Sequence, residues 1–365
     1  MQFEFFPSRT LAVYLSRLFI TRILAVLVML VLVLLVLDLL GESGDILAYP
    51  GNGQAQLLHY ASMRVPQLIA RFLPYSVLLA TIITLATLNQ NSEVISMKAA
   101  GLSAHQILAP LILTATLVAG LSLWFNERVV TRATATLTAW EAVDYGPIPE
   151  QTSLRSNVYL SDGSDILMAS TVSGLGRAMV MTRVTYYRRD AEGMIVEQMR
   201  APRATYAGDG WTLENPVRFD TRTTSSEQLA AATVARGITP SQVEISKVDA
   251  DAQNLFELSD SIAALKAAGR RTSELEAAWW HKLSGPLAAV LMPLLGAVAA
   301  FGLARSGQLL IRAVIGMALG FAYFVIDNAA LAMGNFGGYP PLIAAWAPFL
   351  LFALIGETVL VRTEE

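Results

Sequence analysis

Four ionisable side chains lie in or beside long apolar stretches, where charge is costly. Asp38 and Asp327 fall within such stretches, and Arg64 and Arg71 lie in "MRVPQLIARFLP". A charged side chain at mid-bilayer costs about 2.5–3.5 kcal/mol on insertion scales, so it usually faces a protein interior or a water-filled cavity. The guanidinium of arginine binds phosphate or carboxylate bidentately. Arg64 and Arg71 are therefore candidate contacts for an anionic lipid head group, and Asp327 is a third candidate substrate-binding residue.

Each of these residues also has a plainer interpretation. Asp38 lies near the outer end of its stretch, which favours a hydrated position at the membrane interface. Asp327 is open to a structural role as well as a transport role. Arg64 and Arg71 could pair with these aspartates or only anchor the interface.

Motifs for catalysis are sparse. Neither G-x-x-x-x-G-K-[ST] nor H-E-x-x-H occurs, and the three histidines, His59, His105 and His281, are scattered without ligand spacing. "GLSAH" (101–105) contains a serine and a histidine, but neighbours in sequence cannot form a catalytic triad. The absence of cysteine excludes thiolate metal sites and disulfides. We expect no catalytic residue, no metal and no cofactor in this chain, and no nucleotide site of its own.

A short polar segment, "LNQNSEVISMKAAGLSAHQIL" (88–108), interrupts two apolar stretches. Ser92 is an N-cap type, and Glu93 suits the first turn of a helix because of the helix dipole. Gly101 suits the C′ position that ends a helix. The segment therefore predicts a separate short helix over about 91–101.

The predicted short helix has an apolar stripe, with Val94 and Met97, and a polar remainder, with Glu93 and Lys98. It could rest on lipid, or it could be a knob that fits a groove of a cytoplasmic partner. ATP-driven exporters need such a knob, because closure of separate nucleotide-binding subunits must reach the membrane helices. The missing nucleotide motif favours this second interpretation. The predicted coupling residues are Glu93, Val94, Met97, Lys98 and Gly101.

The composition is that of a membrane protein. Of the 365 residues, 54% are hydrophobic and 15% are charged, whereas soluble proteins have about 25% charged residues. Six apolar segments are each long enough to cross about 30 Å of hydrocarbon as a helix. They are 11–40, 68–88, 104–125, 283–304, 309–333 and 341–361. The first is too long for the apolar part of a signal peptide, so we expect it to remain as an anchor.

Residues 130–278 have the composition of a soluble domain. Strand-like runs over 155–222 surround three turn dipeptides, Asp162-Gly163, Glu192-Gly193 and Asp209-Gly210. The sequence thus predicts an α-helical membrane protein with six transmembrane helices (3+3) and an inserted antiparallel β-domain, a sandwich or a roll, which the family resemblance described below makes jellyroll-like. The expected parts are 1–129 with three membrane helices, 130–278 as the β-domain, and 279–365 with three more.

The positive charges of the short loops indicate the orientation. On one side lie Arg9, Arg17, Arg22, Lys98, Arg305, Arg312 and Arg362. The loops of the other side carry Glu42, Asp45 and Arg64 in one and no charge in "GNFGGYPP". We therefore expect both termini and the short helix in the cytoplasm and the β-domain in the periplasm. The net charge of −3, without a basic run, gives no support to nucleic-acid binding.

Two regions of the sequence resemble a known family. "RVPQLIARFLPYSVLLATIITLATL" and "NSEVISMKAAGLS" resemble the coupling-helix region of LptF and LptG, the paired permease subunits of the lipopolysaccharide export transporter. The similarity resumes in "WWHKLSGPLAAVLMPLLGAVAAFGLARSGQLLIRAVIGMALGFAYFVIDN" and "GYPPLIAAWAPFLL". "FGLARS" and "GYPP" are more similar to the G-type subunit. The match is specific over about 60–128 and 279–361, and the β-domain matches in position and character only.

This resemblance implies half of an ABC transporter in the bacterial inner membrane. An F-type subunit would complete the membrane part, and a dimer of the ATPase LptB would bind ATP and Mg and drive export. Lipopolysaccharide would leave the membrane toward the periplasmic components LptC and LptA. Glu93 matches the acidic coupling-helix residue of the family and would contact the ATPase groove. The chain itself would be a non-enzymatic subunit.

The sequence departs from the family pattern at the outer end of the first span. G-type subunits carry lysines there that meet lipid A phosphates, whereas "LLVLDLLGESGD" has the acids Asp38, Glu42 and Asp45 and no base. Either Arg64 and Arg71, or the partner subunit, supply the positive charge, or the lipid carries less phosphate.

Two other functions stay open on the sequence. A permease of another ABC lipid or lipoprotein exporter would be expected to carry its outer domain between the first two spans, whereas here this domain follows the third. A membrane-anchored periplasmic scaffold would need no coupling helix.

Overall fold

The computed structural model describes residues 7–147, 155–162, 165–174, 176–190, 193–221, 223–240, 243, 249–267, 270–301 and 309–364. The chain divides into two compact units. Unit 1 comprises Met1–Gly41, Leu58–Thr134 and Ala250–Glu365, and unit 2 comprises Glu42–Leu57 and Ala135–Asp249. The divisions thus fall at 41/42, 57/58, 134/135 and 249/250.

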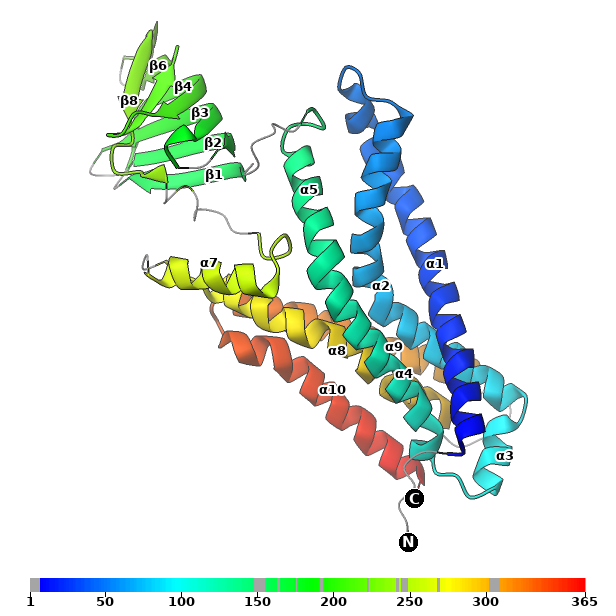
Figure 1. The fold of residues 1–365 in the computed structure, drawn as a ribbon. Coiled ribbons are helices and arrows are strands. Elements are labelled where there is room, and N and C mark those ends of the chain that lie inside the picture. Colours follow the sequence, from blue (N-terminus) through cyan, green and yellow to red (C-terminus); the bar gives the residue numbers. More distant parts are fainter. Residues whose placement is uncertain are drawn as a thin grey trace. The chain divides into compact units, whose positions relative to one another are not determined.

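Long helices make up unit 1 (Figure 1). The helices are α1 (Arg9–Ala48), α2 (Gln54–Gln90), α3 (Glu93–Ala99), α4 (Ala104–Phe125), α5 (Thr131–Glu141), α7 (Leu255–Ala267), α8 (Ser273–Phe301), α9 (Leu309–Asn335) and α10 (Pro341–Glu364). The end of α1, the start of α2 and most of α5 belong to unit 2. Each of the six apolar segments expected from the sequence overlaps one of the long helices.

Five helices are long and apolar enough to cross a membrane within the described part of the chain. These are Arg9–Ala48, Gln54–Gln90, Ala104–Glu141, Val314–Asn335 and Pro341–Arg362. The protein is therefore a multi-pass membrane protein. The sixth expected span, 283–304, falls on α8 and runs into residues that are not described, so the count of six stays a prediction.

The third long helix continues beyond the expected membrane segment. α4 passes into a π turn, Asn126–Val130, and then directly into α5. The expected boundary at 130 rested on the change from apolar to polar residues. That change marks the end of the apolar segment, but "NERVVTRATATLTAWE" has no glycine or proline that would end a helix.

The core of unit 1 forms where α8 packs against α4, α9 and α10. Its fully buried large side chains include Phe19, Leu85, Leu108, Met292 and Tyr323. Small residues allow close approach of helices in membranes. A Cβ atom on Gly296 of α8 would lie 2.6 Å from the Thr81 side chain of α2, so this position requires glycine.

Unit 2 contains an eight-stranded antiparallel sheet. The strands are β1 (Arg155–Asp162), β2 (Asp165–Ser173), β3 (Val180–Arg189), β4 (Ile195–Tyr206), β5 (Trp211–Glu214), β6 (Val217–Asp220), β7 (Ser225–Gln228) and β8 (Ala231–Val234). The order is β1-β2-β3-β4-β5-β8, and the β6–β7 hairpin branches off at β4. The long strand β4 pairs with β6 through residues 197–200 and with β5 through residues 203–206. The antiparallel β-domain expected from the sequence is confirmed.

All three predicted hairpins are present. Asp162 is opposite Asp165, so a two-residue connection joins β1 and β2, although Gly163 itself lies outside the described residues. Gly193 (φ +82°) lies between β3 and β4, and Gly210 (φ +158°) lies between β4 and β5. Trp211 is fully buried in the domain core, and its Nε1 donates a hydrogen bond to the Ile238 carbonyl at 3.0 Å.

Candidate functional sites: the short helix and the buried charges

α3 is the short helix predicted from the sequence, and its C-terminal end is a Schellman motif. Gly101 has φ +90°, and its N–H donates to the Lys98 carbonyl at 3.0 Å. The N–H of Leu102 donates to the Met97 carbonyl at 3.1 Å. These two bonds satisfy carbonyls that would otherwise have no partner. At the other end, Ser92 is left-handed (φ 61°) and its side chain makes no cap hydrogen bond. Gly101 thus ends α3 as expected, whereas Ser92 does not cap it.

The two sides of α3 differ in their surroundings. Val94 and Met97 are buried and belong to the core of unit 1. Ile95, with 57% exposure, and Lys98 lie on the solvent side. Val94 and Met97 therefore anchor α3 to the core of its own subunit.

Glu93 connects α3 to the first long helix. Its Oε2 accepts a hydrogen bond from the Tyr14 hydroxyl of α1 at 3.0 Å, and its Oε1 accepts one from Asn91 Nδ2 at 3.3 Å. Glu93 remains partly exposed. It therefore positions α3 against α1 and still presents part of its carboxylate to solvent.

The serine and the histidine of "GLSAH" contact different residues. Ser103 is the N-cap of α4 and forms a capping box with Gln106, in which each side chain bonds the backbone N–H of the other residue. His105 Nε2 lies 2.9 Å from Glu357 Oε1 of α10. Neither side chain thus points to a hydrolytic site.

Asp38 and Arg64 form a bidentate ion pair between α1 and α2. Arg64 Nη2 lies 2.8 Å from Asp38 Oδ1, and Arg64 Nε lies 2.9 Å from Asp38 Oδ2. The Tyr60 hydroxyl donates to Oδ2 at 2.8 Å, and Arg64 Nη1 donates to Gln67 at 2.8 Å. The simple hydration expected for Asp38 is therefore wrong, because its side chain is only 20% exposed and accepts three hydrogen bonds, two from Arg64 and one from Tyr60. The charge of Arg64 is balanced within the subunit.

Asp327 is a buried carboxylate in α9. Its Oδ2 lies 3.0 Å from Nε2 of His281 in α8, and its residue exposure is 7%. One turn earlier, Phe324 stacks on Tyr75 of α2 at a centroid distance of 3.8 Å. Asp327 therefore joins α9 to α8 and is not paired with either of the arginines considered above.

The comparison with protein families decides what kind of protein carries these features. A family model described as "Lipopolysaccharide export system permease LptF/LptG" matches residues 13–362.

The chain belongs to the LptF/LptG family.

Curated relatives agree with this membership. The "Lipopolysaccharide export system permease protein LptG" of Escherichia coli (strain K12) is 25% identical over 312 residues, which cover 83% of this chain and 84% of the relative. The protein of the same name from Haemophilus influenzae is 24% identical over 308 residues, 82% of this chain and 84% of the relative. The resemblance to the G-type subunit of LptF/LptG is thus confirmed, and the chain is a permease subunit of the lipopolysaccharide export system.

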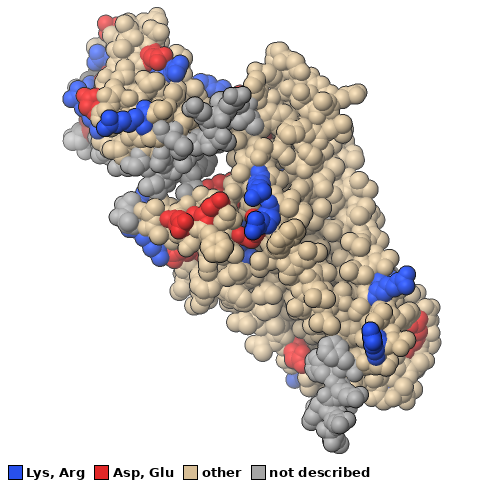
Figure 2. Space-filling model, viewed as in Figure 1, with Lys and Arg blue, Asp and Glu red and all other residues tan. Residues whose placement is uncertain are grey.

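Further cations lie exposed on the long helices of this LptF/LptG chain. Arg71 is exposed, and no ion pair is found for it among the described residues. The exposed Arg128 and Arg132 lie one turn apart in the third long helix, just beyond its apolar segment. The sequence did not single out these two residues, because the predicted apolar segment ends at 125. On the face shown in Figure 2, the long helices present a mostly uncharged surface between charged regions near α3 and α7.

Some residues named in the sequence prediction lie outside the part of this LptF/LptG chain that the structure describes. Arg305 lies outside the described residues, and so does the side chain of Arg312. Within the described part of the chain, no three acidic or histidine side chains are placed to hold a metal ion.

Proposed function

We propose that this chain is the G-type half of a heterodimeric permease that removes lipopolysaccharide from the inner membrane. An F-type subunit would form the other half, and a separate ATPase dimer would drive the pair. Periplasmic components of the LptC and LptA type would receive the lipid. Family membership and the names of the relatives support the permease function, and the geometry of α3 supports the link to an ATPase.

The observation that carries the coupling proposal is the placement of α3. A helix that transmits force must be fixed to the moving helices and must also offer a surface to its partner. Val94 and Met97 fix α3 in the core of unit 1, and Glu93 connects it to α1. Ile95 and Lys98 leave a mixed apolar and positive surface outside. Such a surface suits a groove with apolar walls and acidic groups.

The charge arrangement narrows the proposed contacts with the lipid. Lipid A phosphates need cations, and Arg64 is already neutralised by Asp38. We therefore assign the phosphate contact to Arg71 and treat Arg64 as a residue that holds α1 against α2. Asp327, paired with His281, is assigned a structural role between α8 and α9.

The proposed orientation places α3 and both termini in the cytoplasm and the β-sheet in the periplasm. Lys98 and the arginines at the start of α1 support this assignment through the positive-inside rule. Cysteine substitutions in this cysteine-free chain provide a direct test. A cysteine at Asp209 should react with a membrane-impermeant maleimide in intact spheroplasts, whereas one at Lys98 should react only after lysis. The reverse pattern would contradict the orientation.

Affinity purification in mild detergent tests the proposed assembly. We expect an ATPase and a second multi-pass permease to copurify with the tagged chain, and we expect Glu93→Lys to reduce the ATPase but not the permease. Purification of the chain alone under these conditions would contradict the assembly. An unchanged amount of ATPase with Glu93→Lys would contradict the role of α3.

A further inference from the structure

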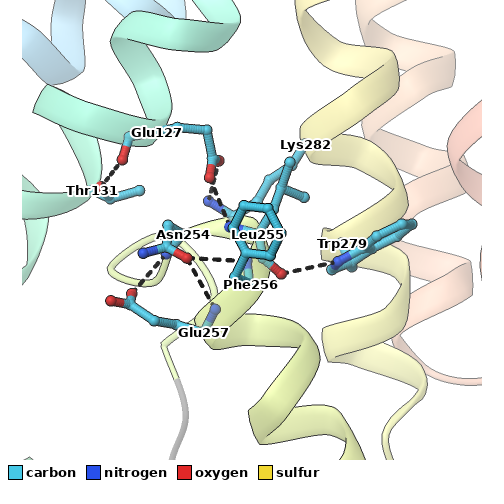
Figure 3. Close-up of polar contacts among 8 residues, drawn as sticks. All are labelled: Glu127, Thr131, Asn254, Leu255, Phe256, Glu257, Trp279 and Lys282. Carbon is cyan, nitrogen blue, oxygen red and sulfur yellow. Dashed lines mark hydrogen bonds and ion pairs between the residues drawn. The ribbon is translucent and has the colours of Figure 1, made fainter.

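Glu127 lies in the π turn Asn126–Val130, where the third long helix is irregular. π turns inside α-helices are frequent at functional sites. The Thr131 hydroxyl donates to the Glu127 carbonyl at 3.0 Å and so satisfies a backbone group of this turn. The carboxylate of Glu127 points toward α7 and α8 (Figure 3). The irregular turn thus places a charged group against two helices that come much later in the sequence.

The carboxylate completes the N-terminal cap of α7. Asn254 Oδ1 accepts the N–H groups of Phe256 (3.0 Å) and Glu257 (2.9 Å), and Glu257 Oε2 accepts the N–H of Asn254 (3.0 Å). The N–H of Leu255 instead donates to Oε2 of Glu127 at 2.7 Å. A negative charge at this end of a helix is favoured by the helix dipole. One of the N–H groups that α7 cannot satisfy itself is therefore satisfied from the third long helix.

Two side chains of α8 contact Leu255 and Glu127. Trp279 Nε1 donates to the Leu255 carbonyl at 3.2 Å. The Lys282 ammonium lies 4.0 Å from Oε1 of Glu127, and the two side chains are only 7% and 17% exposed. A buried charge is stable only with compensating partners. Glu127 therefore joins the third long helix, the start of α7 and α8 at one buried junction.

This junction lies close in sequence to the points where the chain leaves unit 1 and returns to it. The chain leaves unit 1 after Thr134 and returns to it at Ala250. Glu127 lies shortly before the exit, and Leu255 lies shortly after the return. The Glu127 carboxylate thus joins the two segments that connect unit 1 to the β-strands at their bases, and α8 contacts this junction through Lys282 and Trp279.

We propose that Glu127 is a positioning residue for lipopolysaccharide export, because it keeps both connecting segments attached to α8. A displacement of α8 then moves both segments together. The inference rests on the export function proposed above and adds a residue on which transmission within the subunit depends. Loss of a hydrogen bond to a charged group shifts a local equilibrium roughly tenfold or more, so the junction should open readily without this carboxylate.

The first test compares Glu127→Ala with Glu257→Ala in cells depleted of the wild-type chain. Both variants remove a carboxylate that accepts a backbone N–H at the N-terminal end of α7. Only Glu127→Ala also removes the connection to the third long helix and α8. We expect Glu127→Ala to lower export roughly tenfold at unchanged abundance and ATPase association, and Glu257→Ala to export normally. Normal export with Glu127→Ala, or equal impairment of both variants, would overturn the proposal.

The second test replaces the connection by a covalent one. The chain has no cysteine, so Glu127→Cys and Leu255→Cys can be joined by a short bifunctional thiol reagent in membrane vesicles. We expect the double variant to export poorly before the reaction and to recover after it. Export that stays low in the cross-linked protein would overturn the proposal, because an intact connection should suffice.

A third pair of variants covers the case in which Glu127→Ala does not accumulate. Glu127→Gln keeps an oxygen for the Leu255 N–H but removes the negative charge beside Lys282, and adding Lys282→Met removes the positive charge of this pair as well. The double variant should export more than Glu127→Gln alone, and equal or lower export would contradict the proposal. If the wild-type chain itself does not restore export, the proposed function fails. If the wild-type chain restores export and all Glu127 variants export equally well, only the inference about Glu127 fails.

Discussion

At the level of single residues, the Asp38–Arg64 pair is the clearest case of charge used for internal support. Asp38 receives three hydrogen bonds, two from Arg64 and one from Tyr60. Charge-assisted bidentate pairs are among the stronger polar contacts in proteins. The sequence placed both residues near the same membrane interface, so pairing was one open alternative. Predicting this pair would require knowing how α1 and α2 are aligned along their lengths, which apolar periodicity does not determine.

Single substitutions in this pair should destabilise the protein. Asp38→Asn leaves the guanidinium of the partly buried Arg64 without its counter-charge. We expect a loss of about 1–3 kcal/mol, measured as a lower Tm of the detergent-purified protein. Asp38→Asn combined with Arg64→Gln should lose less than the sum of the two single variants. Strict additivity would show that the pair contributes no coupling energy.

Glu276 at the start of α8 gives a pH-dependent contribution outside the expected membrane segment. A hydrogen bond of 2.5 Å from the Thr272 hydroxyl holds its pKa below the ordinary value of 4.5, and the Lys266 ammonium at 3.0 Å acts in the same direction against the effect of burial. A carboxyl group with a lowered pKa stabilises the fold above its unfolded pKa, and this contribution disappears as the pH falls through the folded pKa. We therefore expect the corner between α7 and α8 to lose stability only in acid, below pH 4.5.

Thermal unfolding of wild type and Glu276→Gln as the pH is lowered tests this expectation. The wild-type Tm should fall more steeply in acid than that of Glu276→Gln, whose side chain does not titrate. Parallel pH profiles would show that the contacts of Glu276 do not stabilise the fold.

At the level of elements, α3 shows what the sequence could and could not predict. Its existence, its end at Gly101 and its apolar stripe all followed from local rules of capping and periodicity. Which side faces a partner did not follow, because periodicity cannot tell a side that packs on its own subunit from one that is free to bind. The buried Val94 and Met97 belong to the first kind.

Substitutions on the two sides of α3 should therefore have different effects. Ile95→Asp on the exposed side should reduce the amount of copurified ATPase with little change in Tm. Met97→Ala should lower the Tm, since truncating a buried side chain of this kind costs about 2–5 kcal/mol. Equal loss of the ATPase in both variants at equal stability would contradict the assignment of the two sides.

The third long helix shows a different limit of the sequence. Apolar composition correctly placed its segment at 104–125, but the helix continues through a π turn to Glu141. A π turn has no simple sequence signal, and the polar residues after 125 are compatible with helix. The sequence therefore did not identify Glu127, Arg128 and Arg132 as residues of the same continuous helix.

At the level of the whole molecule, most of the architecture could be predicted. The apolar segments, the hairpins and the resemblance to LptF/LptG all led to the observed classes of structure. The branched strand order, with β6 on one part of β4 and β5 on another, could not be predicted. It depends on contacts between strands, and local turn signals do not report them.

The central claim is that this chain moves lipopolysaccharide by means of a partner's ATP hydrolysis. The most direct measurement places a photo-crosslinking residue at Arg71 in the purified transporter complex, reconstituted with lipopolysaccharide, and follows adduct formation with and without ATP. A matched position on α10, Leu354, is exposed and apolar and serves as the control. We predict that the adduct at 71 changes with ATP hydrolysis while the adduct at 354 does not. No adduct at 71, or adducts at both positions that are insensitive to ATP, would contradict the account.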